Sequence, residues 1–106
     1  MRVVYKYPLE KAQLQEVRMP SGAIILCVQI QGPNSVCVWA LVDTTHPTIR
    51  RRFKICTTGE ELAQDVKVMH YVGTIQSPIS GDVFHFFSDR VEYPDVEPST
   101  RAEDTI

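Results

Sequence analysis

A chain of 106 residues with a hydrophobic fraction of 43% and a charged fraction of 23% is long enough for one globular domain with a buried core. Its net charge of −2 argues against a protein that binds nucleic acid in bulk, because such proteins carry a clear basic excess. The charge is uneven, since residues 89–106 hold six acidic and two basic side chains and residues 1–88 carry a net charge of +2. The charge of residues 1–88 therefore suits a small anionic ligand.

The apolar runs of the sequence are too short for a membrane span. The longest, 23–28 and 36–42, fall far below the roughly 20 residues that cross a bilayer. Lys6 and Pro8 stand where a signal peptide requires an apolar stretch. We therefore expect a cytoplasmic protein without a membrane partner.

The cysteines argue against a disulfide framework and against a zinc site. Cys27, Cys37 and Cys56 are odd in number, widely spaced and without a C-x-x-C pair. In a hairpin around a turn at 32–35, with Gln31 paired to Val36, Cys27 faces Ala40. Cys37 faces Ile30 in the same register, so no disulfide joins the two strands. Reduced thiols are the expectation, and no cofactor or metal is predicted.

Runs with a period of two, broken by turn residues, predict strands along most of the chain. In chain order these runs are 3–7, 14–19, 23–31, 36–43, 50–57, 68–76 and 83–88. The run 23–31 places Ile24, Leu26, Val28 and Ile30 on one face. The run 36–43 is apolar on both faces, as a central strand requires. The pattern predicts a mostly β protein, a small antiparallel sandwich or barrel of six to seven strands.

The segment between Thr57 and Met69 departs from this pattern. Thr58-Gly59-Glu60-Glu61 fits a capping box in which the Glu61 carboxylate reaches back to a free amide. Leu62, Val66 and Met69 lie on one helical stripe. Two alternatives follow for residues 59–68, a single short helix or a structured loop, because helix propensity alone is a weak guide.

The alternation ends after Ser88, which predicts one β domain over residues 1–88. Residues 89–106 form an acidic C-terminal tail in this interpretation, either disordered or docked on a partner. Open edges in so small a sheet are commonly covered by a second copy, so we expect a homo-oligomer.

The basic cluster Arg50-Arg51-Arg52 with Lys54 is the clearest local feature. On a strand, Arg50, Arg52 and Lys54 share a face, with about 7 Å between successive side chains. Arginine forks match phosphate and carboxylate groups, so these three residues are candidate ligands for a small anion. The alternative is a solvated outer face that protects the sheet from edge pairing.

Four further residues are candidates for ligand contact: Trp39, His70, Tyr71 and His85. Trp39 lies in an apolar strand and is either a core residue or a stacking surface for a ring. His85, between Phe84 and Phe86, is either a hydrogen-bonded rim residue or a ligand contact. His70 and Tyr71 either line a pocket or lie on an exposed strand.

Catalytic signatures are absent from the sequence. It has no glycine-rich phosphate loop, no Gly-x-Ser-x-Gly elbow and no His-Glu-x-x-His. Folding could still bring a nucleophile, Cys56, together with His70 or His85, although no spacing in the sequence favours this arrangement. No catalytic residues are therefore assigned.

Several short motifs follow one another along residues 3–88. They are Tyr7-Pro8-Leu9, Met19-Pro20-x-Gly22-Ala23-x-Ile25-Leu26-x-Val28-Gln29, Trp39-Ala40-Leu41-Val42-Asp43, Thr58-Gly59, Tyr71-x-Gly73-Thr74-x-Gln76 and Val83-Phe84-His85-x-Phe87. The pattern resembles a family of small uncharacterised proteins from bacteriophage and bacterial genomes. The resemblance implies a common fold and a phage or prophage origin, and it carries over no functional residues.

Three hypotheses about function follow. The first is a non-enzymatic phage accessory protein, of the counter-defence kind, that sequesters or blocks a host protein or a small phosphate-bearing signal. The second is a structural or assembly component of the phage particle. The third is a small nucleotide hydrolase.

Overall fold

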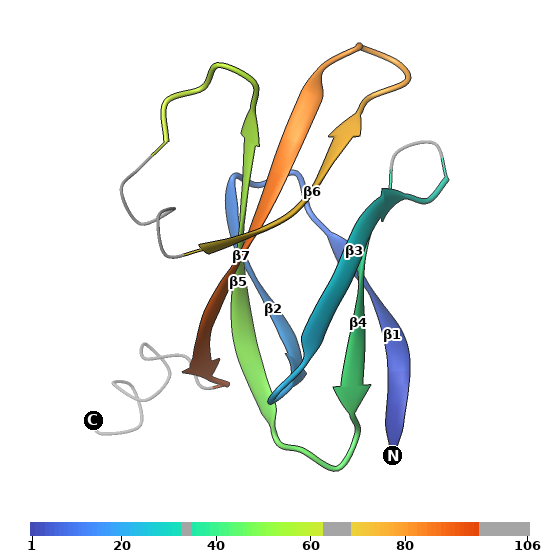
Figure 1. The fold of residues 1–106 in the computed structure, drawn as a ribbon, viewed down its shortest axis with the longest axis vertical. Coiled ribbons are helices and arrows are strands. Elements are labelled where there is room, and N and C mark those ends of the chain that lie inside the picture. Colours follow the sequence, from blue (N-terminus) through green and yellow to red (C-terminus); the bar gives the residue numbers. More distant parts are fainter. Residues whose placement is uncertain (33–34, 63–68, 96–106) are drawn as a thin grey trace, which may run out of the picture.

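The computed structural model describes residues 1–32, 35–62 and 69–95. Within them the chain forms seven strands: β1 (Arg2–Leu9), β2 (Leu14–Pro20), β3 (Ile24–Ile30), β4 (Val36–Asp43), β5 (Thr48–Thr57), β6 (Met69–Gln76) and β7 (Val83–Pro94). They make two antiparallel sheets, one in the order β1-β4-β3 and one in the order β2-β5-β7-β6. The sheets face each other (Figure 1), which confirms the predicted small β-sandwich.

The core lies between the two sheets. It is built mainly by β4, whose Val38, Ala40 and Val42 alternate toward the opposite sheet and are at most 1% exposed. Phe53 of β5 and Phe86 of β7 meet them from the other side. Because β4 is the middle strand of its sheet, the run predicted to be central is central.

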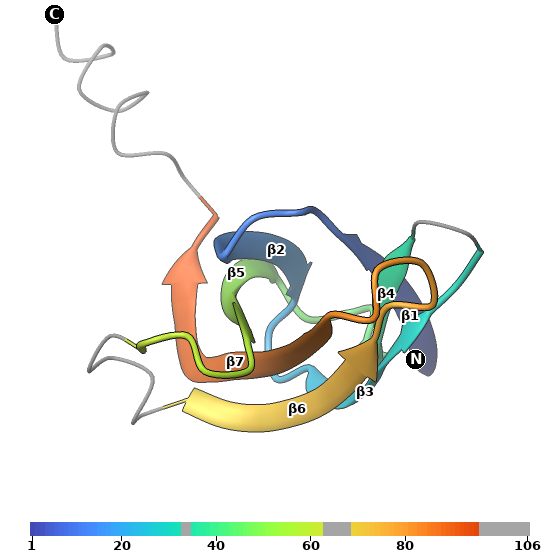
Figure 2. The same cartoon turned by 90° about the horizontal axis from the view of Figure 1, so that it is seen from above.

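Strand β6 closes one side of the sandwich by approaching β3 (Figure 2). The approach depends on Gly73, where an added Cβ would lie 2.8 Å from Cγ1 of Val28. The ladder between β6 and β7 also shifts register between Tyr71 and Gly73. A glycine inside a strand often marks a bulge or a close backbone approach, and here it marks both.

A bulge in β3 overturns the predicted faces of that strand. The register with β4 shifts between Ile25 and Cys27, so Val28 points into the core while Ile24 and Leu26 stay 53% and 49% exposed. The predicted hairpin register is wrong by one residue on β3, because Cys27 lies opposite Trp39. The backbone amide of Gln31 donates to the carbonyl of Ser35 (2.7 Å), so Gln31 lies opposite Ser35 and not opposite Val36. The three cysteines are free, as expected.

Strand β7 continues to Pro94, six residues beyond the predicted end of the domain at Ser88. The alternation stops at residue 88 because the ladder with β5 bulges there: Phe53 pairs with Ser88 and Arg51 pairs with Glu92. The Asp89 carboxylate accepts the Val91 amide (2.9 Å) within the bulge. The remainder of the predicted tail, 96–106, lies outside the described residues.

The segment left open between a short helix and a structured loop begins with a turn at residues 58–59. The carboxylate that reaches back belongs to Glu60, which accepts the Thr57 amide (2.9 Å) and hydroxyl (3.2 Å). The predicted capping box of Thr58 with Glu61 is therefore wrong by one residue. Residues 63–68, which include most of the segment for which a helix or a loop was expected, lie outside the described part of the chain.

Candidate functional site: a pocket at the end of the sandwich

A cavity of about 510 Å³ opens between the two sheets at the end away from Met1, the upper end in Figure 1. Its walls come from the ends of six strands and consist of half-buried apolar side chains: Leu9, Ile30, Val36, Ile55, Ile75 and Phe84. Phe86, 2% exposed, belongs both to the lining and to the core. The core therefore does not fill this end of the molecule.

Polar groups at the mouth of this end pocket are held by the protein's own hydrogen bonds. The side-chain amide of Gln13 donates to the Glu60 carboxylate (2.9 Å), and the backbone carbonyl of Gln13 accepts the backbone amide of Ile55 (2.8 Å). Across the mouth, the Ser77 hydroxyl accepts the amides of Ile79 and Ser80, both at 3.3 Å. Apolar walls with a few fixed polar groups are typical of small-molecule sites, whose volumes run from about 300 to 1,000 Å³.

The predicted anion ligands lie elsewhere, on the face of β5 opposite to buried Phe53. Arg50 donates to Glu16 (2.8 Å) and to the Pro94 carbonyl (2.9 Å). Arg52 donates to Asp89 (3.4 Å) and lies 5.0 Å from the centre of the Tyr93 ring. Lys54 follows on the same face, half-buried.

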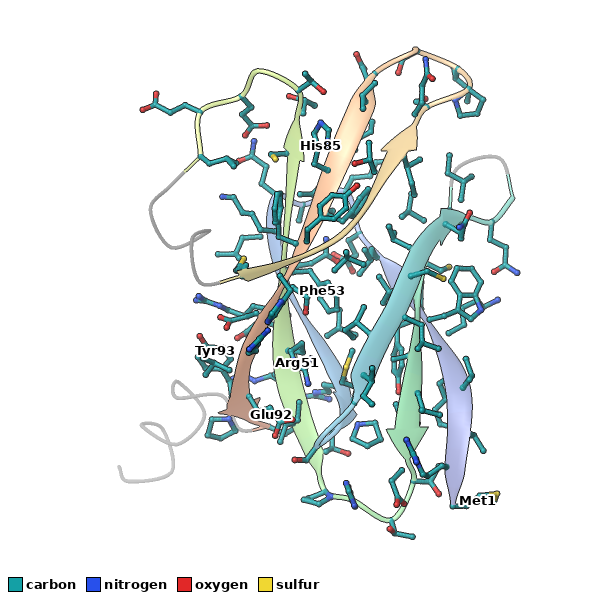
Figure 3. All side chains as sticks on the ribbon, viewed as in Figure 1. Met1, Arg51, Phe53, His85, Glu92 and Tyr93 are labelled. Atoms are coloured by element: carbon teal, nitrogen blue, oxygen red, sulfur yellow. The ribbon has the colours of Figure 1, made fainter. Side chains whose placement is uncertain are left out.

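The charges of this arginine cluster are balanced by acids. Four ion pairs are Arg18–Asp95, Arg50–Glu16, Arg51–Glu92 and Arg52–Asp89. Figure 3 shows Arg51, Glu92 and Tyr93 gathered at the end of β5 and β7 away from the end pocket. Two of the three predicted anion ligands, Arg50 and Arg52, are therefore held in ion pairs with carboxylates of the same sheet.

Trp39 lies on the outer face of the other sheet. It alternates with buried Val38 and Ala40, and its neighbours in the ladder are Lys6 on β1 and Cys27 on β3. Its side chain is half-buried, so it is neither a core residue nor part of the end pocket.

His70 and Tyr71 line a second, smaller cavity of about 390 Å³ between β3 and β6. The Arg90 guanidinium lies 3.2 Å from Nδ1 of His70. Tyr71 is 61% exposed and packs edge-on against Phe87, with ring centres 5.9 Å apart. These two predicted residues therefore share a cavity with each other, and with none of the other predicted site residues.

His85 is held by two threonines on the outer face of β7. Its Nε2 lies 2.7 Å from the Thr58 hydroxyl, and its Nδ1 lies 3.0 Å from the Thr74 hydroxyl. In Figure 3 it lies at the upper end of the sandwich, remote from Arg51. The arrangement is that of a hydrogen-bonded rim histidine.

Cys56 pairs with His85 across the β5–β7 ladder, which brings together two residues considered for a nucleophile. Both ring nitrogens of His85 are engaged by hydroxyl groups, so neither is free to take the proton of the thiol. Burial, followed by the charge of Glu60, raises the pKa of the Cys56 thiol, whereas an activated cysteine needs a lowered pKa. The geometry gives this cysteine no activation.

Within residues 1–32, 35–62 and 69–95, no group of three or more His, Cys, Asp or Glu side chains is arranged to hold a metal ion. The same part of the chain contains no helix long and apolar enough to cross a membrane.

The sequence analysis missed the end pocket, although its walls left a signal. Leu9, Ile30, Val36 and Phe84 are apolar residues next to turns. In antiparallel sheets alternate turns meet at the same end of the molecule, so apolar residues beside such turns meet there too. Their distance in sequence hides the grouping until the strand order is known.

Two antiparallel sheets around one core, with an apolar pocket at one end, define a small β-sandwich. The chain belongs to the family described as a domain of unknown function (DUF7352), whose model matches residues 1–96. The match includes the whole of β7, in agreement with a domain that extends past Ser88. No curated protein and no solved structure matches the chain.

Proposed function

We propose that this protein is a non-enzymatic binding protein that holds a small, largely apolar molecule in the end pocket. The observation that carries the proposal is the set of six strand ends whose apolar side chains stay half-buried around one cavity of about 510 Å³. Apolar surface that the core leaves open costs free energy in water, and a ligand that covers it recovers roughly 25 cal/mol per Å².

A small molecule suits this site better than a protein partner. The cavity is concave and its volume lies within the range of small-molecule sites, whereas specific protein interfaces cover roughly 800 Å² per partner and are flatter. The fixed polar groups at the mouth, Gln13 with Glu60 and Ser77 with its amide donors, would orient a polar end of the ligand.

The biological setting of the proposal is the phage origin that the sequence motifs imply. In that setting the protein is an accessory factor of counter-defence type that sequesters a small host molecule in the host cytoplasm. The ion pairs of Arg50 and Arg52 argue against an anion-binding stripe on the outer face of β5, and the hydrogen bonds of His85 argue against hydrolysis by Cys56.

Native electrospray mass spectrometry of the purified recombinant protein is the first test, because it reports subunit number and any retained ligand together. The second is titration with the uncharged probe N-phenyl-1-naphthylamine. We expect saturable binding by the wild type and at least a tenfold loss in Val36→Trp, whose indole would occupy the cavity.

Val91→Trp is the matched control, because Val91 is 51% exposed on β7 and does not line the pocket. Circular dichroism verifies that both variants fold. Equal probe binding by the two variants, or no binding by the folded wild type, would contradict the proposal.

A further inference from the structure

The cleft between β3 and β6 holds a buried arginine with an unused donor. Arg51 is 8% exposed and lines this cavity of about 390 Å³. Its Nη2 donates to the Ala23 carbonyl (3.0 Å) and to Glu92 (3.4 Å), whereas its buried Nε has no hydrogen-bond partner among the described residues. A buried donor without an acceptor is costly, so this N–H favours an acceptor brought in from outside.

A second cation lies in the same cleft. Arg90 lines the cavity from β7, exposed, with its guanidinium beside His70. The hydroxyl of Ser88, 3% exposed, also lies in the lining and donates to the carbonyl of Asp89 (3.3 Å). The cleft therefore presents one buried and one exposed guanidinium from adjacent strands.

The neighbouring acids do not cancel both cations. Asp89 accepts from Arg52, from the Val91 amide and from the Tyr93 hydroxyl (3.2 Å). Glu92 accepts from Ser21 and Gly22 as well as from Arg51. Asp89 also lines the cleft but pairs with Arg52 of the outer face, and Glu92 pairs with Arg51, so the charge of Arg90 is the one that these two acids do not balance.

We infer that this cleft is an oxyanion site, distinct from the end pocket, that binds a phosphate group carried by a small molecule. The anion accepts from Nε of Arg51 and from the Arg90 guanidinium, in the charge-assisted manner that suits arginine. Ile25 and Val72 give the cleft an apolar wall, and its volume of about 390 Å³ has room for an organic group beside the phosphate.

The test is a titration of the full chain with inorganic phosphate, followed by ¹H–¹⁵N spectra of the arginine Nε groups and by calorimetry. We expect a saturable shift of the Arg51 Nε–H signal. Arg90→Gln removes the charge of Arg90 and is expected to weaken phosphate binding about threefold, because an exposed charge is screened by solvent. Arg51→Lys keeps the charge but loses the fork and weakens binding about tenfold.

Arg18→Gln is the matched control, because Arg18 pairs with Asp95 and does not line the cleft. Acetate is titrated in parallel, and binding of acetate as tight as that of phosphate would overturn the assignment to phosphate. If Arg51→Lys does not fold, the phosphate affinity of Arg90→Gln alone tests the site. An unmoved Arg51 signal, or equal phosphate affinity of Arg90→Gln and Arg18→Gln, would overturn the site, and neither result bears on the end pocket.

Discussion

Glu92 of β7 forms hydrogen bonds to the turn that connects the two sheets. Its replacement by glutamine tests how much these bonds and the contact with Arg51 contribute to stability. Its carboxylate accepts the Gly22 amide (2.6 Å) and the Ser21 hydroxyl (2.7 Å) in the turn between β2 and β3. It also faces the Arg51 guanidinium at 3.4 Å. One side chain of β7 thus fixes the turn through which the chain passes from one sheet to the other.

The magnitude follows from the charge that Glu92→Gln removes. Hydrogen bonds to a charged group contribute about 1.5–3 kcal/mol, and glutamine retains one acceptor oxygen, so we expect a loss of about 2 kcal/mol. In a domain of this size that lowers Tm by about 8–16 °C. Glu16→Gln, which removes an exposed partner of Arg50, is the control, with an expected loss below about 1 kcal/mol.

The effect has a defined pH dependence. The Gly22 amide and the Ser21 hydroxyl, with the charge of Arg51, hold the pKa of Glu92 below its ordinary value of 4.5. A carboxylate with a lowered folded-state pKa stabilises the protein above its unfolded pKa, and this contribution is lost as pH falls through the folded pKa. Wild type and Glu92→Gln therefore differ at about pH 7 and converge at acidic pH.

Urea unfolding of both proteins at neutral and at acidic pH measures this difference. The reasoning is refuted if the gap between wild type and Glu92→Gln is the same at both pH values. It is refuted equally if Glu92→Gln is no less stable than Glu16→Gln at neutral pH.

Three further predictions use the same unfolding assay or mass spectrometry. Gly73→Ala forces a methyl group against Val28 and is expected to cost about 1–3 kcal/mol; a double-mutant cycle with Val28→Ala should show favourable coupling, and additivity would contradict the contact. Phe53→Ala empties a fully buried site and is expected to cost about 3–5 kcal/mol, so a loss below 1 kcal/mol would contradict its core position. Alkylation with iodoacetamide should label half-buried Cys27 before buried Cys56, and the reverse order would contradict the burial of Cys56 and its raised pKa.

The positions of the strands were largely predictable because each side chain in a strand reports its own face. The alternation in 50–57 placed Arg50 and Arg52 on one face of the strand, and the doubly apolar run 36–43 identified the middle strand. The failures occur at bulges. The extra residue of the bulge in β3 places Leu26 on the outer face of that strand, opposite to the prediction. A bulge after Ser88 interrupts the alternation, so the last six residues of β7 were not recognised as a strand.

The candidate sites were far less predictable, because they combine residues that the sequence keeps apart. The arginines were recognised as a cluster, but their acidic partners come from β2 and from the end of β7 that was assigned to a tail. Within the cluster 50–52, the arginine that lines a cavity is Arg51, which lies on the opposite face of β5 from Arg50 and Arg52 and was not among the predicted ligands.

By itself the sequence determined that this protein is a small β domain with a central strand at 36–43, since the two-residue period of a strand is a local property. Only the tertiary structure decided which charges pair and where the core stops. Strand order β2-β5-β7-β6 sets residues more than 30 positions apart side by side, so Arg50 meets Glu16 and Arg51 meets Glu92. The end pocket arises in the same way, because it exists only where the ends of six strands are brought together.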